Sequence, residues 1–460
     1  MVQFVAVIDL GKTNSKVALV DTSTSTELEI LKQPSAVDST GLYPSLDHQA
    51  IKSFIFDSLK CFAKNHRIDA ITVTTHGATA ALITANGDLA LPVLDYEYAD
   101  IDELRPQYNL HRPSFEQTGS PALPGGLNIG AQLFWLQTKF PEQFAKAACV
   151  LTWPQYWVHV LTAERHNDVT SLGCHTDLYE PHYKRYSTLI DKMKWTSRMP
   201  PTRQSGQISN TLLPQIANEL KLPISLPVHT GIHDSNASLV PHLVSHSSPF
   251  SVVSTGTWFI VMAIGGVPAT LHERRDTLLN VNALGEPVPS ARFMGGRERD
   301  LLDKHSQGSE DALKSLLSDI NSAPMLMPSV VPNTGPYPNE THRWIEVEPP
   351  QGSPLRSCAI ALYLALMTNE CMHMVGCDGP TYIEGPLAQD QVYAQMLSVV
   401  SDRSVWISDS ETGTSVGAAM LIEKPVRPPS YTSVTLDPSL RDPLQRYAIV
   451  WQKHLQKALS

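Results

Sequence analysis

Two stretches of the chain each place a short polar turn between two runs of apolar and β-branched residues. The first covers residues 5–21, with glycine, lysine and hydroxyl residues at its centre, and the second covers residues 251–261, with Ser254-Thr255-Gly256-Thr257 at its centre. This pattern predicts a hairpin of two buried strands in each stretch. The same design therefore occurs once near the start of the chain and once in its second half.

The rest of the hydrophobic pattern predicts further helices and strands. Apolar residues at helical spacing predict helices over 47–65, 127–140, 212–220, 359–375, 390–400 and 415–421, and apolar runs predict strands over 70–75, 81–84, 381–383 and 405–407. Pro141 is expected to end the helix over 127–140. Residues 94–126 carry several prolines and a glycine pair, which predicts an irregular excursion of the kind that shapes a substrate mouth. Alternation of strands and helices is typical of an α/β fold.

Length and charge narrow the class of protein. At 460 residues the chain is too long for one hydrophobic core, so two domains are expected. It has 35 Lys and Arg against 45 Asp and Glu, a formal charge of −10, with no basic block. This balance argues against nucleic acid or an anionic membrane as the main partner. An anionic ligand then needs a local positive site.

The cysteines and the apolar runs bear on location. The six cysteines are scattered without the C-x-x-C spacing of a zinc or redox site, and we expect buried thiols of a cytosolic protein. The N-terminus has no basic region and its apolar run stops at Asp9, so no signal peptide is expected. Residues 359–375 include polar side chains and are expected to form a buried helix, not a membrane span.

The first polar turn has the chemistry of a phosphate site. A glycine there lets backbone N–H groups approach a ligand, hydroxyl and amide side chains add donors, and lysines add positive charge. Asp9, just before the turn, could hold a metal. This set suits a magnesium-bound polyphosphate, although an ordinary hairpin turn uses the same residue types. The turn residues concerned are Gly11, Lys12, Thr13, Asn14, Ser15 and Lys16.

Two other segments carry candidate chemistry. The strand over 70–75 runs into His76-Gly77, and a polar strand end closed by glycine is a favourable place for a small ligand in an α/β sheet. Asp234 follows Gly231 and precedes a helical pattern, so it is expected at or near a helix start, where the positive end of the helix would keep it ionised. A simple helix cap explains the pattern around Asp234 equally well.

These segments together resemble the FGGY carbohydrate kinases of the actin-like ATPase superfamily. The resemblance lies in four motifs and in their order: the stretch over 5–21, Thr230-Gly231-Ile232-His233-Asp234-Ser235-Asn236-Ala237-Ser238, the stretch over 251–261, and Gly413-Thr414-Ser415-Val416-Gly417-Ala418-Ala419-Met420. It covers nearly the whole chain. It implies two ribonuclease-H-like α/β domains flanking a central cleft, with residues 1–244 binding sugar and carrying the first phosphate loop. Residues 245–460 would bind nucleotide and carry the second phosphate loop, with ATP between the domains.

The resemblance also implies roles for individual residues. Asp234 matches the catalytic aspartate of the family and becomes the general base, and Asp9 would orient Mg²⁺. The sugar would be contacted by Thr75, His76, Gly77, His233 and Asp234. Asp95 and Tyr98 lie where family members often present sugar-facing groups, but the usual pattern is not matched there. The phosphates of ATP would be contacted by Gly11, Lys12, Thr13, Asn14, Ser15 and Lys16, and by Ser254, Thr255, Gly256 and Thr257.

The adenine site departs from the family. A glycine-rich turn is expected where this chain has Glu384-Gly385-Pro386-Leu387-Ala388, and only Gly385 matches. Gly385 and Ala418 are the residues that the resemblance places near the purine. For Ala418 and its neighbour Gly417, close packing between helices is the alternative.

The resulting hypothesis is an ATP- and Mg²⁺-dependent sugar kinase. It would transfer the γ-phosphate of ATP to a hydroxyl of a ketose or deoxyketose resembling rhamnulose, fuculose, ribulose or xylulose. A polyol or glycerol-like kinase is one alternative, and a non-kinase actin-like ATPase or nucleotide-binding protein is another. We expect a small-molecule sugar as partner and a cytoplasmic location, with neither nucleic acid nor membrane bound. The oligomeric state stays open, with a homodimer as one alternative.

Overall fold

The chain forms two compact units. The computed structural model describes residues 2–303, 308–408, 413–424 and 429–459. The first unit comprises Met1–Ser245, Leu279–Pro287 and Thr412–Pro428, and the second comprises His246–Leu278, Val288–Glu411 and Pro429–Ser460. Two returning segments of the later chain thus belong with the first unit. The expected central cleft between two domains stays a prediction.

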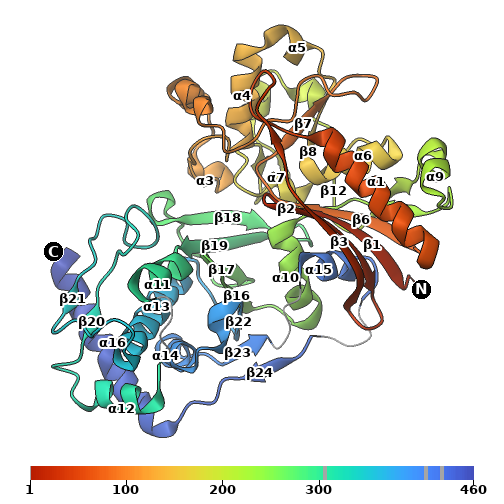
Figure 1. Cartoon of the computed structure of the whole chain (residues 1–460). Helices are drawn as coiled ribbons and strands as arrows, with labels where there is room; N and C mark the ends of the chain where they lie inside the picture. Colours follow the sequence, from red (N-terminus) through yellow and green to blue (C-terminus); the bar gives the residue numbers. More distant parts are fainter. Residues whose placement is uncertain (1, 304–307, 409–412, 425–428, 460) are drawn as a thin grey trace. The chain divides into compact units, whose positions relative to one another are not determined.

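The first unit is built on a seven-stranded mixed sheet (Figure 1). Its strands are β1 (Phe4–Leu10), β2 (Asn14–Asp21), β3 (Thr26–Pro34), β6 (Ala70–Thr75), β13 (Ile208–Thr211), β14 (Pro227–His229) and β15 (Ile232–His233). β1 pairs antiparallel with β2, and β2 pairs antiparallel with β3. On its other side β1 pairs parallel with β6, which pairs parallel with both β14 and β15. The expected first hairpin and the strand over 70–75 are confirmed.

Helices cover both faces of this sheet because successive side chains of a buried strand point to opposite faces. Ala6, Ile8 and Leu10 pack with α1 (His48–Asn65) and α6 (Trp153–Thr162) on one face. Val5 and Val7 pack with α10 (Asp234–Ser245) and α15 (Thr414–Met420) on the other. α9 (Pro214–Leu220) lies beside α1. The helices predicted over 47–65, 212–220 and 415–421 are therefore present, and Asp47 caps the first by accepting a hydrogen bond from the Ala50 amide.

The second unit repeats the same strand plan. Its strands are β16 (Phe250–Thr255), β17 (Phe259–Ile264), β19 (Pro287–Phe293), β22 (Thr381–Glu384), β23 (Val405–Ser408) and β24 (Tyr431–Ser433), with β18 (Thr277–Val281) next to β19. β16, β17 and β19 form an antiparallel run like that of β1, β2 and β3. β22 then pairs parallel with β16 as β6 does with β1. This duplication confirms the hairpin over 251–261.

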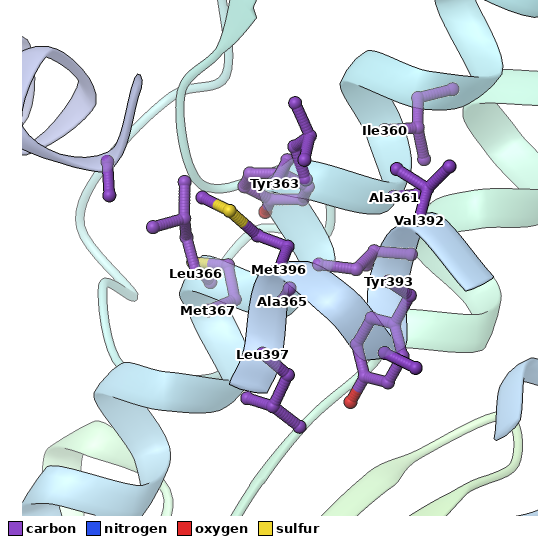
Figure 2. Close-up of a cluster of buried hydrophobic side chains, with 14 of the residues drawn as sticks. Ile360, Ala361, Tyr363, Ala365, Leu366, Met367, Val392, Tyr393, Met396 and Leu397 are labelled. Carbon is purple, nitrogen blue, oxygen red and sulfur yellow. The ribbon is translucent and has the colours of Figure 1, made fainter. Parts of the chain in front are cut away.

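Five helices pack with the sheet in the core of the second unit. They are α11 (Gly295–Asp303), α12 (Glu310–Ser318), α13 (Pro354–Met374), α14 (Gln391–Ser401) and α16 (Pro438–Leu459). Figure 2 shows Tyr363 and Met367 of α13 close to Tyr393 and Met396 of α14, and all four side chains are buried. The helix expected over 359–375 is thus a core helix that begins five residues earlier, at Pro354. No helix within the described ranges combines the length and hydropathy of a membrane span.

The excursion over 94–126 is less irregular than expected. It contains η1 (Ala99–Leu104), α2 (Arg105–Asn109) and α3 (Phe115–Thr118) before α4 (Ile129–Lys139). Proline is tolerated in the first turn of a helix, so Pro106 can sit inside α2. Pro141 acts similarly, since it follows the end of α4 and starts α5 (Pro141–Ala145).

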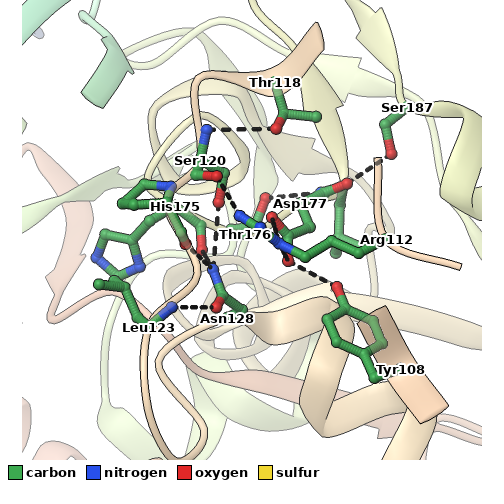
Figure 3. A network of polar contacts seen from close by, with 12 residues as sticks. Tyr108, Arg112, Thr118, Ser120, Leu123, Asn128, His175, Thr176, Asp177 and Ser187 are labelled. Atoms are coloured by element: carbon green, nitrogen blue, oxygen red, sulfur yellow. Dashed lines mark hydrogen bonds and ion pairs between the residues drawn. The ribbon is translucent and has the colours of Figure 1, made fainter. Parts of the chain in front are cut away.

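A buried polar network holds the excursion in place (Figure 3). Arg112 and Asp177 form an ion pair of 3.1 Å between Nε and Oδ2, and the Tyr108 hydroxyl donates to the same carboxylate at 2.6 Å. Asn128 donates from its side-chain amide to the carbonyl oxygens of Pro121 and His175. Turns that lack long secondary structure are thereby fixed through side-chain hydrogen bonds.

Candidate active site

The carboxyl ends of three parallel strands bring the main candidate residues of the first unit together. Asp9 of β1 is in register with Thr74 of β6, and Thr75 of β6 is in register with His233 of β15. His76 and Asp234 directly follow these strands. Because such strand ends meet at one edge of a sheet, these residues from three distant parts of the sequence share one site.

Asp234 is the first residue of α10, so its carboxylate lies at the positive end of a helix. Its side chain is 27% exposed. Burial raises the pKa of Asp234 to about 6, against the opposing effects of His76 and of a hydrogen bond from the Ser235 amide. A carboxylate with this pKa is ionised near neutral pH and is still able to take a proton. The placement and the pKa both suit a general base.

His233 lies against Asp234. Its Nε2 atom is 3.2 Å from Asp234 Oδ1, and its Nδ1 atom is 3.3 Å from Nδ2 of Asn236. Burial lowers the pKa of His233 to about 4, so the ring is neutral near pH 7. A Cβ atom at Gly77 would lie 2.8 Å from His233 Nε2. Glycine at position 77 is therefore required for the imidazole to occupy this place.

His76 offers a hydrogen-bond acceptor. Its Nδ1 atom donates to the carbonyl oxygen of Gly77 at 2.9 Å, and burial lowers its pKa. A neutral ring with a proton on Nδ1 carries a lone pair on Nε2. The ring lies edge-on to Tyr96, with 5.4 Å between centroids. The Thr75 hydroxyl is less available as a donor to a ligand, because it already donates to the backbone oxygen of His76 at 2.8 Å.

Asp9 is anchored from helix α15. Its Oδ2 atom accepts hydrogen bonds from the hydroxyls of Thr414 and Ser415, the latter at 3.1 Å, and lies 3.3 Å from Lys16 Nζ. Lys16 also donates to Glu27 at 2.9 Å. In the described part of the chain, the hydrogen bonds and ion pairs of the Asp9 carboxylate all involve Oδ2. One oriented carboxylate fits Mg²⁺, which is commonly held by one or two carboxylates, water and substrate phosphate.

Lys12, in the first turn, contacts the loop over residues 95–97. Lys12 Nζ forms an ion pair with Asp95, lies 3.2 Å from Glu97 Oε2 and sits 4.7 Å from the centroid of the Tyr96 ring. Two other residues of the turn, Gly11 and Ser15, also form contacts within the protein. The Gly11 amide donates to the Asn14 carbonyl at 2.9 Å, and the Ser15 hydroxyl lies 3.2 Å from that of Ser35, whereas the Thr13 and Asn14 side chains are exposed.

The second turn, between β16 and β17, is tied to the Gly385 turn. The Thr255 hydroxyl donates to the Glu384 carbonyl at 2.7 Å and accepts from the Leu387 amide at 3.0 Å. Gly385 has a φ of 89°, a conformation that favours glycine. A Cβ atom at Gly296 would lie 2.3 Å from the Gly256 carbonyl, so the start of α11 also packs closely on this turn. Ser254 lies in β16 just before this turn, where it pairs with Ile260 of β17, and Thr257 lies within the turn.

A pocket of about 630 Å³ in the second unit adjoins the Gly385 turn. Its lining includes Pro386, Gln389, Asp390 and Arg299, and Arg299 Nη2 lies 4.0 Å from Asp390 Oδ2. Ala418 is in the other unit, where it is 1% exposed in the apolar contact between α15 and the sheet. A Cβ atom at Gly417 would lie 1.9 Å from the Ala237 carbonyl, so these small residues allow α15 to pack closely on α10.

Sequence reasoning missed four residues that the structure places at this site. Thr414 and Ser415 bond Asp9, Tyr96 lies between Lys12 and His76, and Asn236 bonds His233. Thr414, Ser415 and Asn236 lie inside motifs already singled out, so hydroxyl and amide side chains at those helix starts were an available signal. No pattern in the sequence distinguishes Tyr96 from its neighbours.

Comparisons with known proteins agree with this architecture. Residues 4–241 match the model of the FGGY family of carbohydrate kinases, N-terminal domain, and residues 247–429 match that of carbohydrate kinase FGGY, C-terminal domain. An L-fuculokinase from Salmonella typhi is 28% identical over 277 residues, which are 57% of this chain and 57% of that protein. An L-fuculokinase from Escherichia coli K12 is 27% identical over 201 residues, 42% of this chain and 41% of that protein. The chain thus matches little more than half the length of these curated relatives at most.

Solved structures match over the whole chain. A carbohydrate kinase from Novosphingobium aromaticivorans has a TM-score of 0.91 at 34% identity, with 100% of both chains covered. A xylulose kinase from Lactobacillus acidophilus has a TM-score of 0.76 at 12% identity, covering 100% of this chain and 99% of that one, and shows the fold alone. The expected two-domain α/β fold is confirmed.

Proposed function

This chain belongs to the FGGY family of carbohydrate kinases, and we propose that it transfers the γ-phosphoryl group of ATP to a hydroxyl of a small sugar. The observation that carries the proposal is the position of Asp234, a carboxylate of raised pKa at a helix start, beside His233 and within electrostatic range of His76. Phosphoryl transfer requires alignment, neutralisation of phosphate charge and a carboxylate that accepts the proton of the attacking hydroxyl.

Asp234 is the general base of this proposal. Burial keeps its pKa at about 6, so the carboxylate is ionised at neutral pH yet basic enough to accept a proton as the hydroxyl attacks. The attacking oxygen then bonds to the γ-phosphorus while the bond from that phosphorus to the bridging oxygen of ADP breaks. Asp234 retains the proton until it passes to solvent.

The residues around Asp234 favour a polyhydroxylated acceptor. His76 presents an Nε2 lone pair that can accept from a sugar hydroxyl, and His233 Nε2 lies 3.2 Å from Oδ1 of the Asp234 carboxylate. Two L-fuculokinases among the relatives favour a ketose or deoxyketose such as fuculose, rhamnulose, ribulose or xylulose. Polyols and glycerol-like compounds are the second substrate class. Thr75 and Gly77 would shape the wall of this pocket.

In this proposal, residues 245–460 bind the nucleotide. The pocket beside Gly385 has both polar and apolar walls and a volume of about 630 Å³, which suits a nucleoside. Asp9 would hold hydrated Mg²⁺, which neutralises phosphate charge when bound. The proposed phosphate contacts are Gly11, Lys12, Thr13, Asn14, Ser15, Lys16, Ser254, Thr255, Gly256 and Thr257.

A coupled assay of ADP release tests the proposal. The full-length protein is incubated with Mg·ATP and a panel containing L-fuculose, L-rhamnulose, ribulose, xylulose, glycerol and erythritol. We expect sugar-dependent ADP release that Asp234→Asn lowers by about 10²–10⁴-fold, the usual range for a lost general base. Asp57→Asn, at an exposed position on α1, is the matched control. ATP turnover that is independent of every sugar and unaffected by Asp234→Asn would instead identify a non-kinase ATPase.

A further inference from the structure

Three side chains near the start of α10 form a chain of hydrogen bonds. Asn236 Nδ2 lies 3.3 Å from His233 Nδ1, and His233 Nε2 lies 3.2 Å from Asp234 Oδ1. Asn236 is 6% exposed and His233 is also 6% exposed, so water does not compete freely for these bonds. The backbone amide of His233 is fixed in addition by the Thr170 hydroxyl at 3.1 Å.

The donor and acceptor properties of these three side chains fix the direction of each hydrogen bond. An amide nitrogen of asparagine only donates, so His233 Nδ1 must accept and carry a lone pair. In a neutral imidazole the proton is then on Nε2, where it is donated to Asp234 Oδ1. The reversed amide would place the proton on Nδ1 and turn the Nε2 lone pair towards a carboxylate oxygen, which is repulsive. The observed orientation of Asn236 is therefore the one that keeps His233 a donor to Asp234.

The hydrogen bonds to Asp234 are unevenly divided between its two oxygens. Oδ1 receives the Ser235 amide at 2.6 Å, the Ser235 hydroxyl at 3.3 Å and His233 Nε2. Within the described ranges none of the hydrogen bonds or ion pairs of Asp234 involves Oδ2. The carboxylate is thus held by one oxygen, and the other is left to accept a proton.

We propose that Asn236 is a positioning residue that fixes His233 as the Nε2–H tautomer, so that His233 anchors Asp234 Oδ1 and leaves Oδ2 as the proton acceptor. This inference rests on the proposed function of Asp234 as general base. The other titratable or charged groups that act on Asp234 are His76, after β6, and Asp9 of β1. Tyr96, on the excursion, is within the electrostatic range of Asp234 as well.

Cys174 supplies the competing arrangement. The Cys174 sulfur lies 3.7 Å from His233 Nε2, the same nitrogen that contacts Asp234 Oδ1. If Asn236 no longer donates to Nδ1, the imidazole proton is free to move to Nδ1, and Nε2 can then accept from the Cys174 thiol. Asp234 Oδ1 would lose a donor and face a lone pair. Both changes disfavour the ionised carboxylate.

Nuclear magnetic resonance of the full-length protein labelled with ¹⁵N-histidine tests the tautomer without any turnover. The His233 signals are assigned by their loss in His233→Gln, and the one-bond and two-bond ¹⁵N–¹H couplings report which ring nitrogen carries the proton. We expect the Nε2–H form in the wild-type protein near pH 7. An Nδ1–H form in the wild-type protein overturns the inference, and this readout does not depend on whether an Asn236 variant folds.

Asn236→Leu removes the donor at similar volume and tests the consequence. We expect loss of the Nε2–H form and an upward shift of about one pH unit in the acid limb of kcat/KM, as for one lost hydrogen bond to a charged group. Asn218→Leu, at an exposed position on α9, is the matched control and should change neither readout. An unchanged tautomer and an unchanged acid limb in Asn236→Leu would overturn the inference. Absence of sugar turnover in a wild-type protein that shows the Nε2–H form would instead contradict the proposed function.

Discussion

Lys12, in the turn between β1 and β2, forms an ion pair with Asp95, which lies 83 residues further along the chain. Glu97 approaches the same ammonium group at 3.2 Å, and the Tyr96 ring packs beside it. The Asp95 side chain is only 9% exposed and that of Lys12 is 21% exposed, so this pair is shielded from solvent. A lysine expected to contact phosphate thus also fixes the loop that carries Tyr96 towards His76.

The first prediction concerns this pair. Lys12→Met leaves Asp95 buried without its cation and loosens the Asp95–Glu97 loop, so we expect KM for the sugar to rise about tenfold, the usual cost of one hydrogen bond to a charged group. Asp95→Asn should have a similar effect, and the double variant should add little, because both changes break one interaction. Steady-state kinetics with each substrate varied in turn gives the two KM values.

Lys32→Met, at an exposed position on β3, is the control for removing a lysine charge. A large rise in KM for ATP without a change in KM for the sugar would show that Lys12 acts on phosphate alone.

The second prediction is a pH dependence set by Asp234. Its folded-state pKa of about 6 lies above the ordinary value of 3.8, and a general base must be deprotonated to act. We therefore expect kcat/KM to fall as the pH drops through about 6. Asp234→Asn should remove this limb together with most of the activity. A pH profile that stays flat between pH 5 and 7 in the wild-type protein would contradict the assignment.

The free energy of unfolding should change with pH in the opposite direction to kcat/KM. Because the folded form binds the Asp234 proton more tightly than the unfolded form, the free energy of unfolding should fall as pH rises from 3.8 to about 6. Asp234→Asn should consequently be more stable than the wild type at pH 7, by at most about 3 kcal/mol, with no difference near pH 4. Thermal unfolding of both proteins at the two pH values checks this.

Local sequence pattern accounts for most of the elements. The alternation over 5–21 and 251–261 identified both hairpins because a strand buried on both faces requires apolar residues throughout. Helix ends were harder: the helix expected over 359–375 begins at Pro354, since the first turn, capped by Ser353, carries polar residues that the apolar pattern does not mark. The turns over 94–126 were expected to be irregular, because short helices such as α2 are too brief to show a hydrophobic period.

The local hydrophobic pattern alone could not predict which residues meet in the candidate site. Asp9, His76 and Asp234 meet through the register of parallel strands, which depends on crossover connections that no local signal specifies. The resemblance to a known family supplied their association. The resemblance did not predict the hydrogen bond from the Thr414 hydroxyl to Asp9, which joins residues 405 positions apart. That contact follows from how α15 packs on the sheet.

The third prediction concerns the hydroxyls on Asp9. Thr414→Val and Ser415→Ala remove the donors that hold Oδ2, so the carboxylate can turn towards Lys16 and lose its orientation. We expect the Mg²⁺ concentration for half-maximal activity to rise about tenfold in the double variant, as for loss of a charge-assisted hydrogen bond. Thr138→Val, which removes a hydroxyl that donates to the Phe134 carbonyl of its own helix, is the control. An unchanged Mg²⁺ requirement would mean that Asp9 is not the residue that orients the metal.

The last prediction addresses the buried network that fixes the excursion (Figure 3). Asp177 has a fully buried side chain, and burial raises its pKa despite the neighbouring Arg112 guanidinium. Arg112→Met leaves this carboxylate without its cation, so we expect a loss of about 3–5 kcal/mol in the free energy of unfolding, typical of breaking a buried ion pair from one side. Asp177→Asn in the Arg112→Met background removes the stranded charge while keeping an acceptor for Tyr108, and should recover part of the loss. Urea denaturation of the three proteins measures these differences. Equal stability of the single and double variants would show that the cost lies in lost packing of the arginine stem, because an uncompensated charge would no longer distinguish them.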